Sequence, residues 1–125
     1  KGMLKETYLT SNMTPMTMVC NSGSWKIVED TCRILAKRHG RLIVAAGTIF
    51  LDDSLGVHKV HGISVPAAFF RIARCTTHPE HRWIWLVQNS RSETKPVRIS
   101  CAVLEQVIHP RESVLSVLKY HGLID

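Results

Sequence analysis

The sequence predicts a single α/β domain of the α+β type, with a mixed, largely antiparallel sheet flanked by helices. Its 125 residues are close to the usual size of one domain. Hydrophobic residues make up 45% and charged residues 21%, which is typical of a globular chain. Segments with the pattern of strands are followed by segments with helical spacing, and this combination predicts helices on the faces of a sheet.

The first long helix is expected at about residues 23–38, because apolar residues recur at helical spacing between cap signals. The residues that predict its buried face are Trp25, Val28, Cys32, Leu35 and Ala36. Asn21 is of a type that begins helices, and Gly40 is a C-terminal stop signal. Before this helix, residues 6–12 are expected to form a short strand that runs into a loop, since Pro15 stops any helix there.

Most of the remaining chain is expected to form strands. Residues 41–47 are apolar, β-branched and bounded by glycines, which predicts a buried strand. Further strands are expected at 57–61, 67–75, 83–87 and 97–99. A helix then begins at Ser100 or Cys101, and a final amphipathic helix follows Pro110. We therefore expect a domain over residues 1–108 and a helical extension over 109–125.

The composition bears on the partners of the chain, on a membrane span and on the state of the cysteines. Sixteen Lys and Arg residues against ten Asp and Glu residues give a net charge of +6, which favours nucleic acid or an acidic surface. The apolar runs are too short to cross a bilayer, so a membrane span is excluded. The four cysteines show no CxxC spacing and are expected to be reduced, packed thiols. The compartment stays open between intracellular and organellar locations, mitochondria among them.

One group of side chains on the expected helix has the composition of a catalytic site. Trp25, Glu29 and Arg33 are each four residues apart and therefore lie along one side of the helix. Asn21 lies at or just before the helix N-terminus, where backbone N–H groups favour a phosphate, and its amide oxygen suits Mg²⁺. Glu29 can hold a metal-bound water, and Arg33 can pair with Glu29 or with a phosphate. The alternative is an ordinary surface helix with a structural Glu–Arg pair.

Motifs on both sides of this helix occur in the order found in a known family. They begin with Ser-Asn-Met-Thr-Pro at residues 11–15 and Asn-x-Gly-x-Trp-x3-Glu-x3-Arg at 21–33. Val-x-x-Gly-Thr-x-Phe at 44–50 and Val-Pro-x-x-Phe-Phe-Arg-Ile at 65–72 follow, then an apolar strand ending in Asn89 and a segment containing Glu105. Together they resemble the DNA/RNA non-specific endonucleases, which are ββα-metal nucleases related to endonuclease G.

The resemblance implies a fold, a cofactor and a role for each matching residue. Asn21 would bind the divalent cation, taken as Mg²⁺, Glu29 would orient a metal-bound water, and Arg33 would support the phosphate. Asn12 matches the Asn of the family's Ser-Asn-x-x-Pro-Gln motif, which helps to order the site around the substrate. The substrate would be DNA or RNA.

The sequence departs from the family in three places. The family's general base is a His in an Asp-Arg-Gly-His strand upstream of the Ser-Asn motif, whereas the first histidine here is His39. Met16 stands where the family has Gln, and residues 109–125 extend past the matching region. A positioned base contributes about 10²–10⁴-fold to such a reaction, so this chain alone is not expected to be an efficient nuclease.

Two functions follow, and both expect a segment or partner chain that completes an incomplete sheet. In the first, the chain is part of a Mg²⁺-dependent non-specific nuclease whose His comes from an upstream segment or from another chain. In the second, it is an inactive, nuclease-derived subunit with a structural or interaction role in a larger, organellar complex. A plain nucleic-acid-binding module overlaps the second.

Three further groups have a structural and a functional interpretation. Cys75-x2-His78-x2-His81 has soft metal ligands, but a solvated loop is favoured over zinc. Trp83 and Trp85 could stack on bases but are more often core residues. The cations at 37–41 are explained by their favourable interaction with the C-terminus of the expected helix. A contact with nucleic acid is the alternative for these residues.

Overall fold

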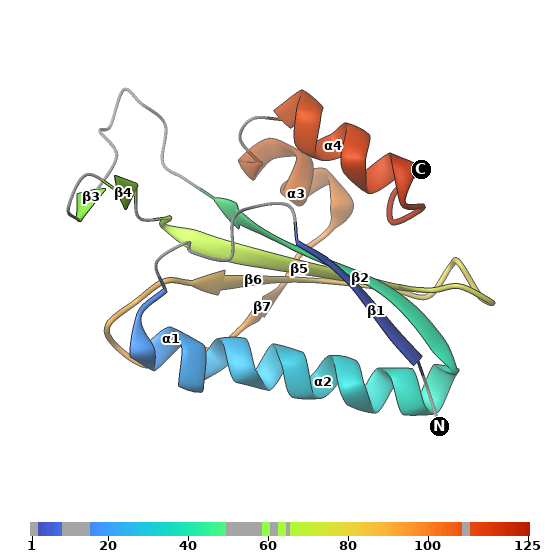
Figure 1. The fold of residues 1–125 in the computed structure, drawn as a ribbon, viewed down its shortest axis with the longest axis horizontal. Helices are drawn as coiled ribbons and strands as arrows, with labels where there is room; N and C mark the ends of the chain where they lie inside the picture. The colour runs from blue at the N-terminus through green and yellow to red at the C-terminus, as the bar shows by residue number, and fades with distance from the viewer. Residues whose placement is uncertain (1–2, 9–15, 50–58, 61–62, 65, 109–110) are drawn as a thin grey trace.

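A five-stranded sheet in the order β1-β2-β5-β6-β7 forms the centre of the computed structural model (Figure 1). The structure describes residues 3–8, 16–49, 59–60, 63–64, 66–108 and 111–125. The strands are β1 (Met3–Tyr8), β2 (Arg41–Ile49), β5 (Ala68–Cys75), β6 (Arg82–Gln88) and β7 (Val97–Arg98). β1 runs parallel to β2, and every other neighbouring pair is antiparallel. The expected α+β fold with a mixed, largely antiparallel sheet is confirmed.

A separate pair of short strands lies outside this sheet. β3 (Lys59–Val60) pairs with β4 (Ile63–Ser64) in antiparallel fashion. The strand expected at 57–61 is confirmed in its described part, and β4 had no counterpart in the sequence analysis. A two-residue strand is too short to show the alternation by which strands are recognised in a sequence.

Helices cover both faces of the sheet (Figure 1). One face carries α1 (Met18–Ser22) and α2 (Ser24–His39), and the other carries α3 (Cys101–Val107) and α4 (Arg111–Tyr120). The helix expected at 23–38 is confirmed as α2. α1 was not expected, and Gly23 separates it from α2. A Cβ atom at position 23 would lie 2.6 Å from the carbonyl oxygen of Val19, so the break between the helices requires glycine.

Alternate residues of the central strands pack on opposite helix layers. On the α2 side, Val44 of β2 and Ala73 of β5 are fully buried together with Cys32 of α2. On the other side, Ile72 of β5 and Ile84 of β6 are buried in a second cluster, which is completed by the helices that follow the sheet. Because the central strands are covered on both faces, they read in the sequence as continuous apolar runs.

The C-terminal residues belong to this second cluster. Leu118 of α4 and Leu123 are fully buried, and Ile124 is 4% exposed. Arg74 of β5 donates through Nη1 to the carbonyl oxygen of Gly122 at 3.1 Å and to Oδ1 of Asp125 at 3.2 Å. The described part of the expected extension, residues 111–125, therefore packs on the sheet beside α3. The domain boundary at 108 stays a prediction.

The expectation of reduced, packed cysteines is confirmed, since all four thiols are free. Cys20, Cys32 and Cys75 are buried, and Cys101 is partly buried. Burial raises the pKa of the Cys20 thiol, against an opposing hydrogen bond with Ser24. Within the described ranges, no helix has both the length and the apolar character that a membrane span requires.

Candidate active site

The side of α2 that carries the motif changes from core to surface along its length. Trp25 is 7% exposed, Glu29 is half-buried, and the Arg33 side chain is 63% exposed. Four residues turn an α-helix by about 400°, so each step along the motif rotates about 40° away from the sheet. Trp25 therefore packs against Phe69 of β5, with ring centroids 5.7 Å apart, while Glu29 lies at the rim.

Asn21 was expected at or just before the N-terminus of the long helix, and it lies just before α2, which begins at Ser24. What the sequence did not indicate is that Asn21 belongs to a separate helix. It lies inside α1, where its backbone N–H donates to the carbonyl oxygen of Thr17 at 2.9 Å. The break at Gly23 creates this helix, capped by Thr17, ahead of α2. Asn21 itself is exposed.

Arg33 has a different partner from the one that its spacing suggested. Its Nη1 lies 2.7 Å from Oδ1 of Asp30, and Nζ of Lys26 lies 2.7 Å from Oδ2 of the same carboxylate. The hydrogen bond from Lys26 is the first cause that lowers the pKa of Asp30, and the charge of Arg33 adds to it. All three side chains are well exposed, so the pairs are weak and Arg33 can exchange Asp30 for a phosphate.

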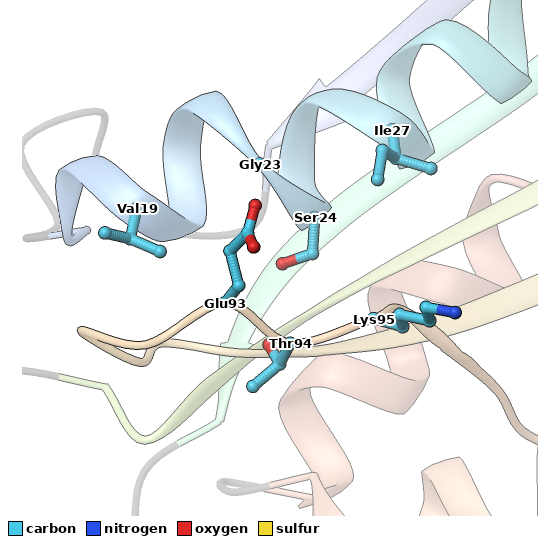
Figure 2. Close-up of a pocket in the computed structure, with 7 residues that line it drawn as sticks. All are labelled: Val19, Gly23, Ser24, Ile27, Glu93, Thr94 and Lys95. Atoms are coloured by element: carbon cyan, nitrogen blue, oxygen red, sulfur yellow. The ribbon is translucent and has the colours of Figure 1, made fainter.

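Glu29 faces away from the pocket drawn in Figure 2. That pocket of about 390 Å³ lies between the α1–α2 junction and the loop before β7. Ile27 and Glu93 line it, and Figure 2 shows the Glu93 carboxylate pointing toward the junction. Glu29 is two residues after Ile27, which places it about 200° around the helix. Glu29 therefore lies on the opposite flank of α2 from this pocket.

Residues 9–15, which follow β1, lie outside the described part of the chain. Asn12, the expected substrate-binding residue, is among them. Its role in ordering the site therefore stays a prediction.

Asn89 holds α1 in place, a role that the sequence analysis did not assign. Its Oδ1 accepts a hydrogen bond from the backbone N–H of Thr17 at 2.8 Å, and its Nδ2 donates to the carbonyl oxygen of Pro66 at 3.0 Å. The Thr17 hydroxyl also donates to the carbonyl oxygen of Ser90 at 2.5 Å. The residues that follow β6 thus hold the N-cap residue of the helix that carries Asn21. In the sequence, this role of Asn89 could have been suspected because a polar residue directly follows an apolar strand.

Arg71 is a second residue without an assigned role. It lies on the α2 side of β5, between Ala46 and Trp85 on the neighbouring strands, and is 1% exposed. Its Cζ is 5.7 Å from the centroid of the Trp25 ring, a cation–π distance. Arg71 is thus a buried side chain against Trp25, which precedes Glu29 by one helical turn. In the sequence, the burial of Arg71 could have been suspected because an arginine stands at an inward position of an apolar strand.

The described histidines lie far from Glu29. His39 ends α2, ten residues or about 15 Å along the helix, and His78 and His81 contact that same end. His121 follows α4, which covers the other face of the sheet. His58, His61 and His109 are outside the described residues. Within the described part of the chain, no group of three His, Cys, Asp or Glu side chains is placed to hold a metal ion.

The sequence comparison agrees with the motifs. The family described as DNA/RNA non-specific endonuclease matches residues 1–115, which is most of the chain and includes the start of α4. No curated protein and no solved structure matches the chain. A match of this length, together with the motif order and the helix-on-sheet arrangement, places the chain in one family: it belongs to the DNA/RNA non-specific endonucleases.

Proposed function

We propose that this domain is the metal-binding part of a Mg²⁺-dependent, sugar-non-specific nuclease, and that its general base comes from an upstream segment or a partner chain. One observation carries the proposal: Asn21 is exposed on α1, and Glu29 is half-buried on the helix that follows it. The substrate is DNA or RNA.

The chemistry of the donors fits magnesium better than zinc. The amide oxygen of Asn21 is a hard ligand, and Mg²⁺ commonly keeps several waters beside one or two protein oxygens. A site of this kind needs no cluster of histidines, cysteines and carboxylates, and none occurs among the described residues. Bound there, Mg²⁺ would supply Lewis-acid stabilisation of the phosphate.

Each side chain then has a distinct task. Asn21 holds the ion, and the carboxylate of Glu29 accepts a hydrogen bond from a water of the hydrated site. Arg33 leaves Asp30 for the phosphate at little cost, because both partners are exposed.

The sheet offers a place for the missing segment. β1 is an edge strand of the sheet and is in contact with α2. An edge strand presents unpaired backbone groups that can accept a further strand. We propose that a strand carrying the catalytic His pairs there.

A structural role is the second candidate. It is favoured by the position of the described histidines, which are about 15 Å from Glu29 or on the far face of the sheet. In that case the domain would be an inactive nuclease-derived subunit that binds a partner chain through the edge of β1.

Nicking of supercoiled plasmid separates the two candidates. The chain is incubated with Mg²⁺, with and without added imidazole, which can replace a missing histidine base. We expect nicking that imidazole increases and that EDTA abolishes. Asn21→Ala and Glu29→Gln should each lower the rate about a hundredfold.

Two matched variants serve as controls. Asp125→Asn changes an exposed acid after α4, which covers the other face of the sheet, and Ser22→Ala changes the exposed residue next to Asn21. Both should keep the rescued activity. Absence of nicking under every condition, or equal loss in the controls, would favour the structural subunit.

A further inference from the structure

Three elements bring basic and aromatic side chains to one end of the molecule, away from the candidate active site. They are the last turn of α2, the first residue of β2 and the β5–β6 hairpin (Figure 1). The hairpin is tied to the other two, since the Thr76 N–H donates to the carbonyl oxygen of Arg41 at 3.1 Å and the Cys75 thiol donates to that of His39 at 3.6 Å. We call this surface the basic corner: Lys37, Arg38, His39, Arg41, His78, His81 and Trp83.

The rings of the basic corner form a connected stack. The imidazoles of His78 and His81 are nearly parallel, with centroids 5.6 Å apart and planes 20° apart. His81 meets His39 edge-on at 5.2 Å, and His39 lies 5.1 Å from Trp83. His78 and His81 are exposed, while Trp83 is partly buried against the core. The outer rings therefore do not hold the core together and are available to a ligand.

The charge of the basic corner is positive. Lys37, Arg38 and Arg41 are exposed, and the acidic residue of the hairpin is Glu80. Cations in the last turn of α2 also stabilise the helix end, but that effect does not account for Arg41 or for imidazoles from another element. Nearer the start of α2 the pattern differs, because Asp30 neutralises the cations there.

We propose that the basic corner binds single-stranded nucleic acid, with the sugar–phosphate backbone on its cations and unpaired bases stacked on its exposed imidazoles. Cationic grooves combined with exposed rings are the usual means of binding single strands. The corner lies about 15 Å along α2 from Glu29, so a strand held there can also reach the cleavage site. This inference rests on the proposed nuclease function and extends it to a second contact with the substrate.

Fluorescence anisotropy with a labelled oligodeoxythymidine, in EDTA to prevent cleavage, tests the proposal directly. His78→Ala/His81→Ala should weaken binding about fivefold or more, the effect of losing one stacked base. Lys37→Ala/Arg38→Ala should weaken binding and reduce the slope of log K against log salt by about 0.7 for each lost phosphate contact. Lys119→Ala, an exposed cation on α4, is the matched control and should bind as the unchanged chain does. Circular dichroism establishes that each variant is folded.

Several results would overturn the proposal. Unchanged affinity in both double variants, or equal loss in Lys119→Ala, would show that the basic corner is not the binding surface. If duplex DNA competed with the labelled oligonucleotide as well as single-stranded DNA does, unpaired bases would not stack on the imidazoles. If the double variants lost binding to vesicles containing phosphatidylserine but kept oligonucleotide affinity, the surface would be a membrane contact.

The binding test is independent of the nicking test. A chain that binds through the basic corner but does not nick plasmid refutes the proposed function alone. A chain that nicks plasmid while its corner variants keep full affinity refutes this inference alone.

Discussion

A substitution at Gly47 tests how tightly the sheet packs around Phe70, on the face that α3 and α4 cover. It lies on β2 directly opposite Phe70 of β5. A Cβ atom at position 47 would lie 2.4 Å from Cε2 and 2.6 Å from Cζ of the Phe70 ring, well inside van der Waals contact. Phe70 is only 1% exposed, so its ring cannot move into solvent. Overpacking of this kind costs about 1–3 kcal/mol.

We therefore expect Gly47→Ala to lower the free energy of unfolding by about 1–3 kcal/mol, which lowers Tm by about 3–6 °C per kcal/mol in a chain of this size. Urea unfolding followed by circular dichroism measures the change. Phe70→Leu removes the two ring atoms in the contact. Adding Gly47→Ala to that variant should then cost much less than adding it to the unchanged chain, and the double-mutant cycle gives the difference.

Gly122→Ala is the matched control for this cycle. Gly122 has φ of +75° and no atom within 4 Å of an added Cβ, so any cost there comes from the backbone. Its cost should be the same with Phe70 or with Leu at position 70. A neutral Gly47→Ala, or a cost unaffected by Phe70→Leu, would show that the ring contact does not limit packing.

Three other variants test the packing and the electrostatics. Asn89→Ala leaves the Thr17 N–H and the Pro66 carbonyl without their partner and should lower the free energy of urea unfolding by about 1–3 kcal/mol. An unchanged free energy of unfolding would show that Asn89 does not hold α1 in place. Leu123→Ala should cost about 2–5 kcal/mol, because the side chain is fully buried, and a smaller cost would show that the C-terminus is loosely packed. The lowered pKa of Asp30 means that its ion pairs stabilise the fold at neutral pH and that this contribution is lost as pH falls through the folded-state pKa. Asp30→Asn should remove that part of the acid dependence, measured by unfolding at several pH values, and an unchanged dependence would contradict the assignment.

Local patterns in the sequence determined most of the elements. The spacing of Trp25, Val28 and Cys32 fixed α2 and its buried face, because a helix brings residues three and four apart to the same side. The apolar run after Gly40 fixed β2 for a comparable reason, since a strand buried on both faces has no polar side. The motif order fixed the family, which depends on residue types and not on their positions in space.

The tertiary structure decided the details of the site. The close approach of Gly23 to Val19 separates α1 from α2 and places Asn21 in a helix of its own, just ahead of the long helix. Arg33 pairs with Asp30 and not with Glu29, although both spacings are possible on a helix. Such choices depend on rotamers and neighbours that no local pattern specifies.

The meeting of His39 with His81 depends on contacts between distant parts of the chain. The two residues are far apart in sequence, and their rings come within 5.2 Å because the β5–β6 hairpin folds back onto the end of α2. The burial of Arg71 beneath Trp25 likewise follows from the packing of a strand on a helix. Periodicity acts over a few residues, whereas sheet pairing and layer packing join residues at any separation, so the sequence predicted the elements and the fold placed the charged groups.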